Sequence, residues 1–82
     1  MDPATMSRLA AESPAQYYAR IYREYIAAKR ANGEATEHIT EQAFATRIQA
    51  MERDAAQKYG RPVRYQVQAR NKEVILIAVP LP

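Results

Sequence analysis

The chain has 82 residues, 48% of them hydrophobic, with a net charge of +3 and no cysteine. A chain of this length forms one domain and buries only roughly 60–65% of its unfolded surface, so tight packing or self-association must keep it folded. The lack of cysteine excludes disulfides and thiol catalysis, and no metal-ligand set is recognisable.

The chain is expected to be cytoplasmic and to have no membrane contact. Its longest apolar run is about six residues, far below the ~20 that span a bilayer, and no signal peptide opens it. The opening MDPAT, before Met6, is interpreted as a vector-derived leader (residues 1–5). Residues 1–12 are predicted to be a flexible N-terminus, and residues 13–82 a single domain.

A first helix is predicted from Ser13 to Asn32. Ser13 suits the N-cap, Pro14 the first helical position, and Gln16 can complete a capping box. Gly33 suits the left-handed position that follows a helix.

Four of the six tyrosines lie in this first helix. A tyrosine buries a large ring while its hydroxyl stays near water, so these residues are expected to border the core. An alternative is that one or two of Tyr17, Tyr22 and Tyr25 anchor a partner.

A second helix is predicted from Thr40, its N-cap, to Tyr59, with Gly60 as its stop. Its apolar residues recur every three or four positions, which is typical of a helix packed on one side. They are Phe44, Ile48, Met51, Ala55 and Tyr59. The short link over residues 33–40 makes the two helices antiparallel neighbours.

Residues 63–79, VRYQVQARNKEVILIAV, predict a β-hairpin with a two-residue turn at Asn71-Lys72. With that turn, Arg70 pairs with Glu73 and Tyr65 pairs with Ala78. An inner face, directed at the helices, then carries Val63, Tyr65, Val67, Ala69, Val74, Leu76 and Ala78. An outer face carries Arg64, Gln66, Gln68, Ile75, Ile77 and Val79.

The second strand of this hairpin is apolar on both faces, which predicts that both are covered. Either residues 6–11 fold back over Ile75 and Ile77, or a partner or a second protomer covers them.

Groups suited to catalysis are few. The one histidine, His38, lies in the polar link, and the close carboxylate pairs are explained by helix capping or diverge on an exposed helix. The two glycines are helix stops, which excludes a glycine-rich phosphate loop. We expect no enzymatic activity, no cofactor and no small-molecule substrate.

The predicted fold class is α+β: two antiparallel helices packed on one face of a C-terminal two-stranded hairpin (ααββ). The predicted core residues are Tyr18, Ile21, Tyr25, Phe44, Ile48, Met51, Val67 and Leu76.

The expected function is protein–protein interaction, with a homodimer as the favoured form. The candidate partner-binding residues are Ile75, Ile77, Val79, Arg64, Gln66 and Tyr22. The alternative is a nucleic-acid-binding domain, since basic residues surround the hairpin beside an aromatic ring. The residues that would serve it are Arg61, Arg64, Arg70 and Lys72.

The segments YYARIYREYIAAKRANGE, AFATRIQAMERDAAQKYG and VRYQVQARNKEVILIAVPL together resemble a small helix–helix–hairpin domain of unknown function that recurs in myxobacterial regulatory proteins. The resemblance covers residues 17–81. It implies a bacterial regulatory or adaptor module and supplies no catalytic or ligand-binding residue.

Overall fold

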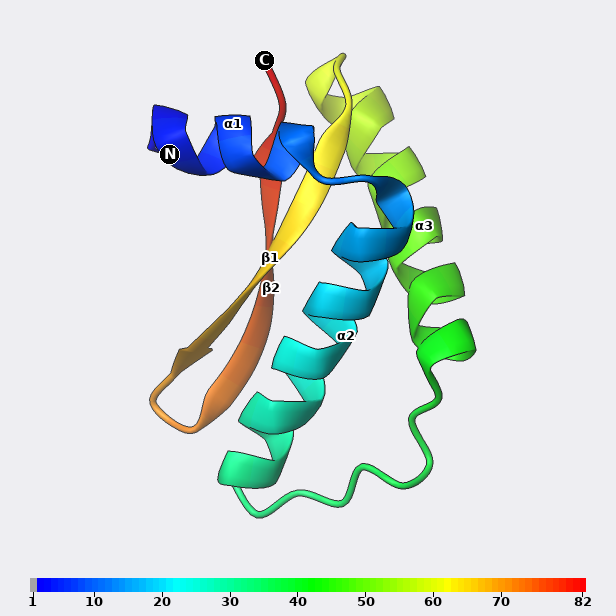
Figure 1. Cartoon of the computed structure of the whole chain (residues 1–82), viewed down its shortest axis with the longest axis vertical. Helices are drawn as coiled ribbons and strands as arrows, with labels where there is room; N and C mark the ends of the chain where they lie inside the picture. The colour runs from blue at the N-terminus through cyan, green and yellow to red at the C-terminus, as the bar shows by residue number, and fades with distance from the viewer. Residues whose placement is uncertain (1) are drawn as a thin grey trace.

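A computed structural model describes residues 2–82 as three helices followed by a hairpin (Figure 1). The elements are α1 (Pro3–Ala11), α2 (Pro14–Ala31), α3 (Glu41–Tyr59), β1 (Val63–Arg70) and β2 (Glu73–Pro80). The predicted α+β class with a C-terminal hairpin is confirmed, but the predicted number of helices is wrong, because α1 adds a third.

α2 and α3 begin with the side-chain caps that the sequence predicts. The Ser13 hydroxyl accepts the Gln16 N–H at 3.2 Å, and the Gln16 side chain accepts the Ser13 N–H at 3.3 Å. Thr40 caps α3 by accepting the Ala43 N–H at 3.1 Å. Both helices therefore satisfy N–H groups that would otherwise lack partners at their first turns.

α1 occupies the segment that was predicted to be flexible. The Asp2 side chain accepts the Ala4 N–H at 3.2 Å, and Pro3 stands in the first turn. Leu9 is 3% exposed, so tertiary contacts hold this helix in place. A helix of 9 residues is too short to be stable alone, which explains why the local sequence does not reveal it. Met1, the first residue of the expected leader, lies outside the described residues.

The hairpin has the predicted register, with Arg70 opposite Glu73 and Tyr65 opposite Ala78. Asn71 and Lys72 have φ angles of 52° and 65°, as a type I′ turn requires. The Asn32 side-chain amide donates to the Lys72 carbonyl at 2.8 Å. This bond ties the turn to the end of α2 and helps to hold a lysine in a left-handed conformation that L-residues disfavour.

α2 and α3 run antiparallel beside the twisted hairpin, and α1 crosses the hairpin near its open end (Figure 1). The buried core draws on all five elements. It consists of Leu9, Tyr17, Ile21, Tyr25, Ile26, Phe44, Ile48, Val63, Tyr65 and Val79. Four residues predicted for the core pack around it and are only partly buried: Tyr18, Met51, Val67 and Leu76.

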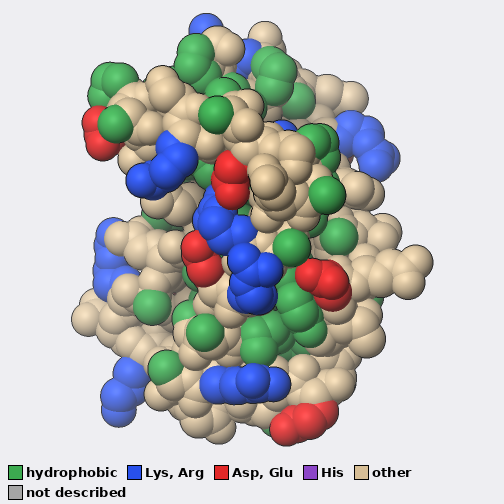
Figure 2. Space-filling model, viewed as in Figure 1, with side chains coloured by type: hydrophobic (Ala, Val, Ile, Leu, Met, Phe, Trp, Pro, Cys, Tyr) green, Lys and Arg blue, Asp and Glu red, His purple; other side chains and the backbone are tan. Residues whose placement is uncertain are grey.

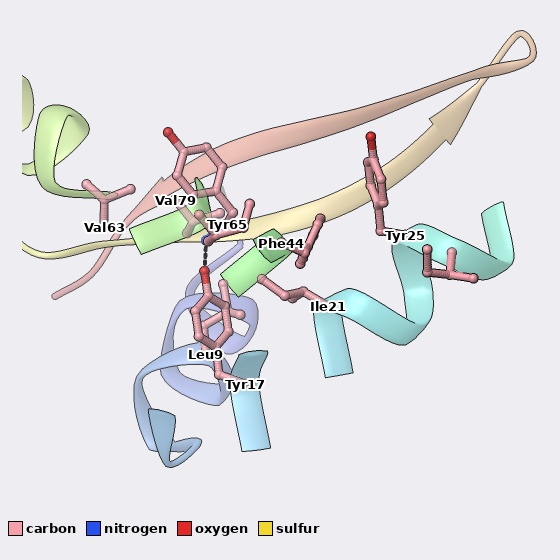
Figure 3. Close-up of a cluster of buried hydrophobic side chains, with 10 residues drawn as sticks. Leu9, Tyr17, Ile21, Tyr25, Phe44, Val63, Tyr65 and Val79 are labelled. Atoms are coloured by element: carbon pink, nitrogen blue, oxygen red, sulfur yellow. Dashed lines mark hydrogen bonds between the residues drawn. The ribbon is translucent and has the colours of Figure 1, made fainter. Parts of the chain in front are cut away.

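Tyr17 links α2 to the edge of β1. Its hydroxyl accepts the Tyr65 N–H at 2.6 Å, as Figure 3 shows. Since this N–H points away from β2, Tyr65 belongs to the set of β1 residues whose main-chain groups face outward. The ring of Tyr17 is 1% exposed, so this bond lies inside the domain.

We expect Tyr17→Phe to lower the free energy of unfolding by roughly 1–3 kcal/mol, because it leaves the buried Tyr65 N–H without an acceptor. Urea unfolding followed by circular dichroism measures this loss. Tyr59→Phe is the matched control, since Tyr59 is 48% exposed, and it should change stability by less than about 0.5 kcal/mol. Equal effects of the two variants would contradict the role given to the Tyr17 hydroxyl.

Candidate interaction surface

The outer face of the hairpin is closed at one end. Val79 was predicted to contact a partner, but it is 0% exposed and belongs to the core together with Leu9 of α1. The correction has a simple cause: α1 folds back over the open end of the hairpin, where Val79 and Arg64 stand opposite each other. One of the two alternatives had residues 6–11 fold back over Ile75 and Ile77. α1 instead packs at Val79, and Ile75 and Ile77 stay partly exposed.

Arg64 holds α1 in this position. Its guanidinium carbon lies 4.7 Å from the centre of the Tyr17 ring, and Nη1 donates to the Glu12 carbonyl at 2.8 Å and also to the Leu9 carbonyl. These carbonyls belong to the end of α1, where helical acceptors lack partners and a cation is favourable. Arg64 is thus engaged within the domain.

A carboxylate reinforces the same junction. Glu12 accepts two hydrogen bonds from Arg20, each 2.7 Å long, and Arg20 also reaches Glu24 at 3.0 Å. The hydrogen bonds from Arg20 hold the pKa of Glu12 below its ordinary value of 4.5, although partial burial acts in the opposite direction. In turn, the hydrogen bonds to Glu12 raise the pKa of Arg20. The segment between α1 and α2 is therefore fixed by charged groups.

The rest of the outer face is open. Gln66, Gln68, Ile75 and Ile77 are each partly exposed, and the two isoleucines lie outside the hydrophobic core. A hollow of about 270 Å³ is lined by three outer-face residues, Gln66, Gln68 and Ile77, together with Val67 of the inner face. Within the described part of the chain, the Oε1 atom of Gln68 is buried and has no hydrogen-bond partner. A buried acceptor without a donor is unfavourable.

Tyr22 lies apart from this face. Its hydroxyl donates to the Ile39 carbonyl at 2.7 Å, and its ring meets Phe44 edge-on with ring centres 5.7 Å apart. Tyr22 therefore connects α2 to the link before α3 and packs against the core, so the structure does not bring it together with Ile75 and Ile77.

The structure also separates the basic residues considered for nucleic-acid binding. Arg61, Arg70 and Lys72 are exposed, whereas Arg64 is engaged by α1. Arg61 precedes β1 and Arg70 ends it, which places their backbones roughly 30 Å apart at the ~3.3 Å rise of a strand. On the face drawn in Figure 2, basic and acidic side chains alternate across the middle of the molecule. No single basic surface joins these four residues.

A second hollow, of about 330 Å³, lies between α3 and the hairpin and was not anticipated from the sequence. It is lined by Met51, Asp54, Ala55, Lys58, Tyr59, Tyr65 and Ala78. Tyr59 was assigned to the apolar stripe of its helix, but it is 48% exposed. Its position as the last helical residue, directly before Gly60, is the sequence signal that it could project beyond the packed turns.

Glu52 is the other polar group that sequence reasoning missed. The Tyr18 hydroxyl donates to its Oε1 atom, and burial together with this carboxylate raises the pKa of Tyr18 to about 12. Burial also raises the pKa of Tyr17 and of Tyr65. These tyrosines stay protonated at neutral pH, so they act here as hydrogen-bond donors or acceptors.

Comparisons with protein-family models, with curated proteins and with solved structures found no match. Among residues 2–82, no helix combines the length and the apolar character needed to cross a membrane. In the same range, no three side chains of the His, Cys, Asp or Glu type are grouped to hold a metal ion.

We expect the stability of the domain to fall in acid through Glu12. Because the pKa of Glu12 is lower in the folded protein, its stabilising effect is fully present above its ordinary pKa and is lost as the pH falls through the folded value. Urea midpoints measured between about pH 7 and pH 3 should therefore fall less steeply in Glu12→Gln, which cannot titrate, than in the wild type. Parallel pH profiles would show that the Glu12–Arg20 pair contributes nothing.

Proposed function

We propose that this chain is a non-enzymatic protein-interaction module that self-associates through the open part of its hairpin. The carrying observation is that β2 presents Ile75 and Ile77 on the outer face, outside the core, while α1 covers the same face only near Val79. Partly exposed branched aliphatic side chains on a sheet face favour contact with another apolar surface.

The size of the chain supports self-association. A domain of 82 residues buries a smaller fraction of its unfolded surface than a larger domain does, and it has no disulfide to stabilise it. Burial of Ile75 and Ile77 in a dimer would add apolar area to that of the core, at roughly 25 cal/mol for each Å² removed from water. A role as an adaptor in a bacterial regulatory system follows from the resemblance described above and is part of the same proposal.

The reduced site differs from the one expected from the sequence. Ile75, Ile77 and Gln66 remain in it, and Gln68 joins them because it lines the same hollow as Gln66 and Ile77. Arg64 and Val79 act instead in holding α1, which limits the surface to the part of the hairpin nearer its turn.

The test is Ile77→Glu, compared with the wild type by light scattering on a size-exclusion column at several concentrations. We expect a dimer for the wild type and a monomer for the variant, because two buried carboxylates at the interface would lack partners. Circular dichroism should show unchanged helix content, since Ile77 lies outside the core.

Gln57→Glu is the matched control, because it also replaces a neutral side chain with glutamate, but at an exposed position of α3. It should leave the dimer intact. A wild type that is monomeric at every concentration would contradict self-association, and an unfolded Ile77→Glu would contradict the placement of Ile77 outside the core.

A further inference from the structure

We infer that the partner is a second copy of this chain, joined along the free edge of β2 in one defined register so that two hairpins form a four-stranded antiparallel sheet. The inference rests on the self-association proposed above and specifies its geometry. Its starting point is the difference between the two edges of the hairpin.

The edge of β1 is partly occupied. Tyr65 is one of the β1 residues whose main-chain N–H and C=O groups point away from β2. Its N–H already donates to the Tyr17 hydroxyl at 2.6 Å. A strand that approached this edge would meet α2 at that point. Pairing on the β1 side would therefore require the loss of a buried hydrogen bond.

The edge of β2 is open. Tyr65 lies opposite Ala78 and directs its N–H away from β2, so the N–H of Ala78 likewise points away from β1. This direction repeats every second residue, so the N–H groups of Leu76 and Val74 also point outward. No acceptor elsewhere in residues 2–82 pairs with these three N–H groups. Unpaired edge groups of this kind are a template for another strand.

The sequence of β2 is nearly symmetric about Leu76: the segment Val74–Ala78 reads VILIA. A two-fold axis at Leu76 would place Leu76 opposite its own copy and Val74 opposite Ala78 of the second copy. These are the outward-directed residues, so each pair can exchange two hydrogen bonds. A two-fold axis makes such an interface self-complementary, as closed dimers require.

The same register pairs the isoleucines on the outer face. Ile75 of each chain would lie opposite Ile77 of the other, in positions without ladder bonds, where side chains approach most closely. Four branched side chains would then cover one another at the centre of the sheet. The ladder would end at Pro80, which has no N–H and would fall opposite Lys72 in the turn.

The area that a small dimer needs is modest. A small specific interface takes about 600 Å² from each partner, whereas this chain exposes 5399 Å² in total. Pairing along the β2 edge, together with contact between the isoleucines, is the kind of contact that such an area requires.

The first test compares two alanine-to-proline variants by light scattering and sedimentation. Ala78→Pro removes an outward N–H from β2, and Ala69→Pro removes an outward N–H from β1, so neither breaks a bond between the two strands. We expect Ala78→Pro to weaken the dimer by roughly tenfold or more, since two bonds are lost per dimer, and Ala69→Pro to leave it unchanged.

The second test uses the absence of cysteine from the chain. Ile75→Cys and Ile77→Cys, mixed and oxidised, should form a disulfide-linked heterodimer, because these positions face each other about 4.5 Å apart at Cα. Either variant alone should cross-link poorly, as its own copy lies diagonally about 7–8 Å away, beyond disulfide reach. This readout does not depend on whether Ala78→Pro folds.

The outcomes separate the two proposals. A dimer that persists in Ala78→Pro, or cross-linking of Ile75→Cys with itself as efficient as in the mixture, would overturn the β2 register and leave self-association in place. A monomeric wild type would overturn both. Loss of the dimer in Ala78→Pro alone, with cross-linking confined to the mixture, is the result expected for the four-stranded sheet.

Discussion

The contact between Arg64 and Tyr17 is the interaction on which the arrangement of the domain depends. The guanidinium carbon of Arg64 lies 4.7 Å from the centre of the Tyr17 ring, and the Tyr17 hydroxyl accepts the Tyr65 N–H. The guanidinium in turn binds the Glu12 carbonyl at the end of α1. One junction thus joins α1 and α2, which are neighbours along the chain, to the distant strand β1. Because its polar groups are paired with one another, they can be buried without a large desolvation cost.

This junction makes the hairpin asymmetric. It occupies the β1 edge at Tyr65 and closes the outer face around Val79, and it leaves the β2 edge and the two isoleucines beside it open. A two-stranded sheet has two edges and two faces to protect, and the three helices found in residues 2–82 cover some of them. The uncovered edge and the uncovered apolar side chains belong to the same strand, so a single partner could satisfy both.

Several polar residues of the domain hold elements together. Glu12 and Arg20 fix the connection between α1 and α2, Asn32 secures the hairpin turn, and the Tyr22 hydroxyl binds the link before α3. Such use of polar groups also explains why the basic residues of the hairpin do not act as one surface: Arg64 is required inside, and the others stand at opposite ends of a strand.

The sequence by itself determined the elements whose signals are local. The capping box at Ser13, the stop at Gly60 and the alternation that gives the hairpin its register each depend on neighbours within a few residues. Tertiary structure decided the rest. α1 is stabilised because Leu9 is buried against distant residues. Arg64, which the sequence places on the outer face, hydrogen-bonds the end of that helix. Val79 and Ile77 lie on the same strand face and both have branched aliphatic side chains, so the position of α1 decides that Val79 is buried while Ile77 stays partly exposed.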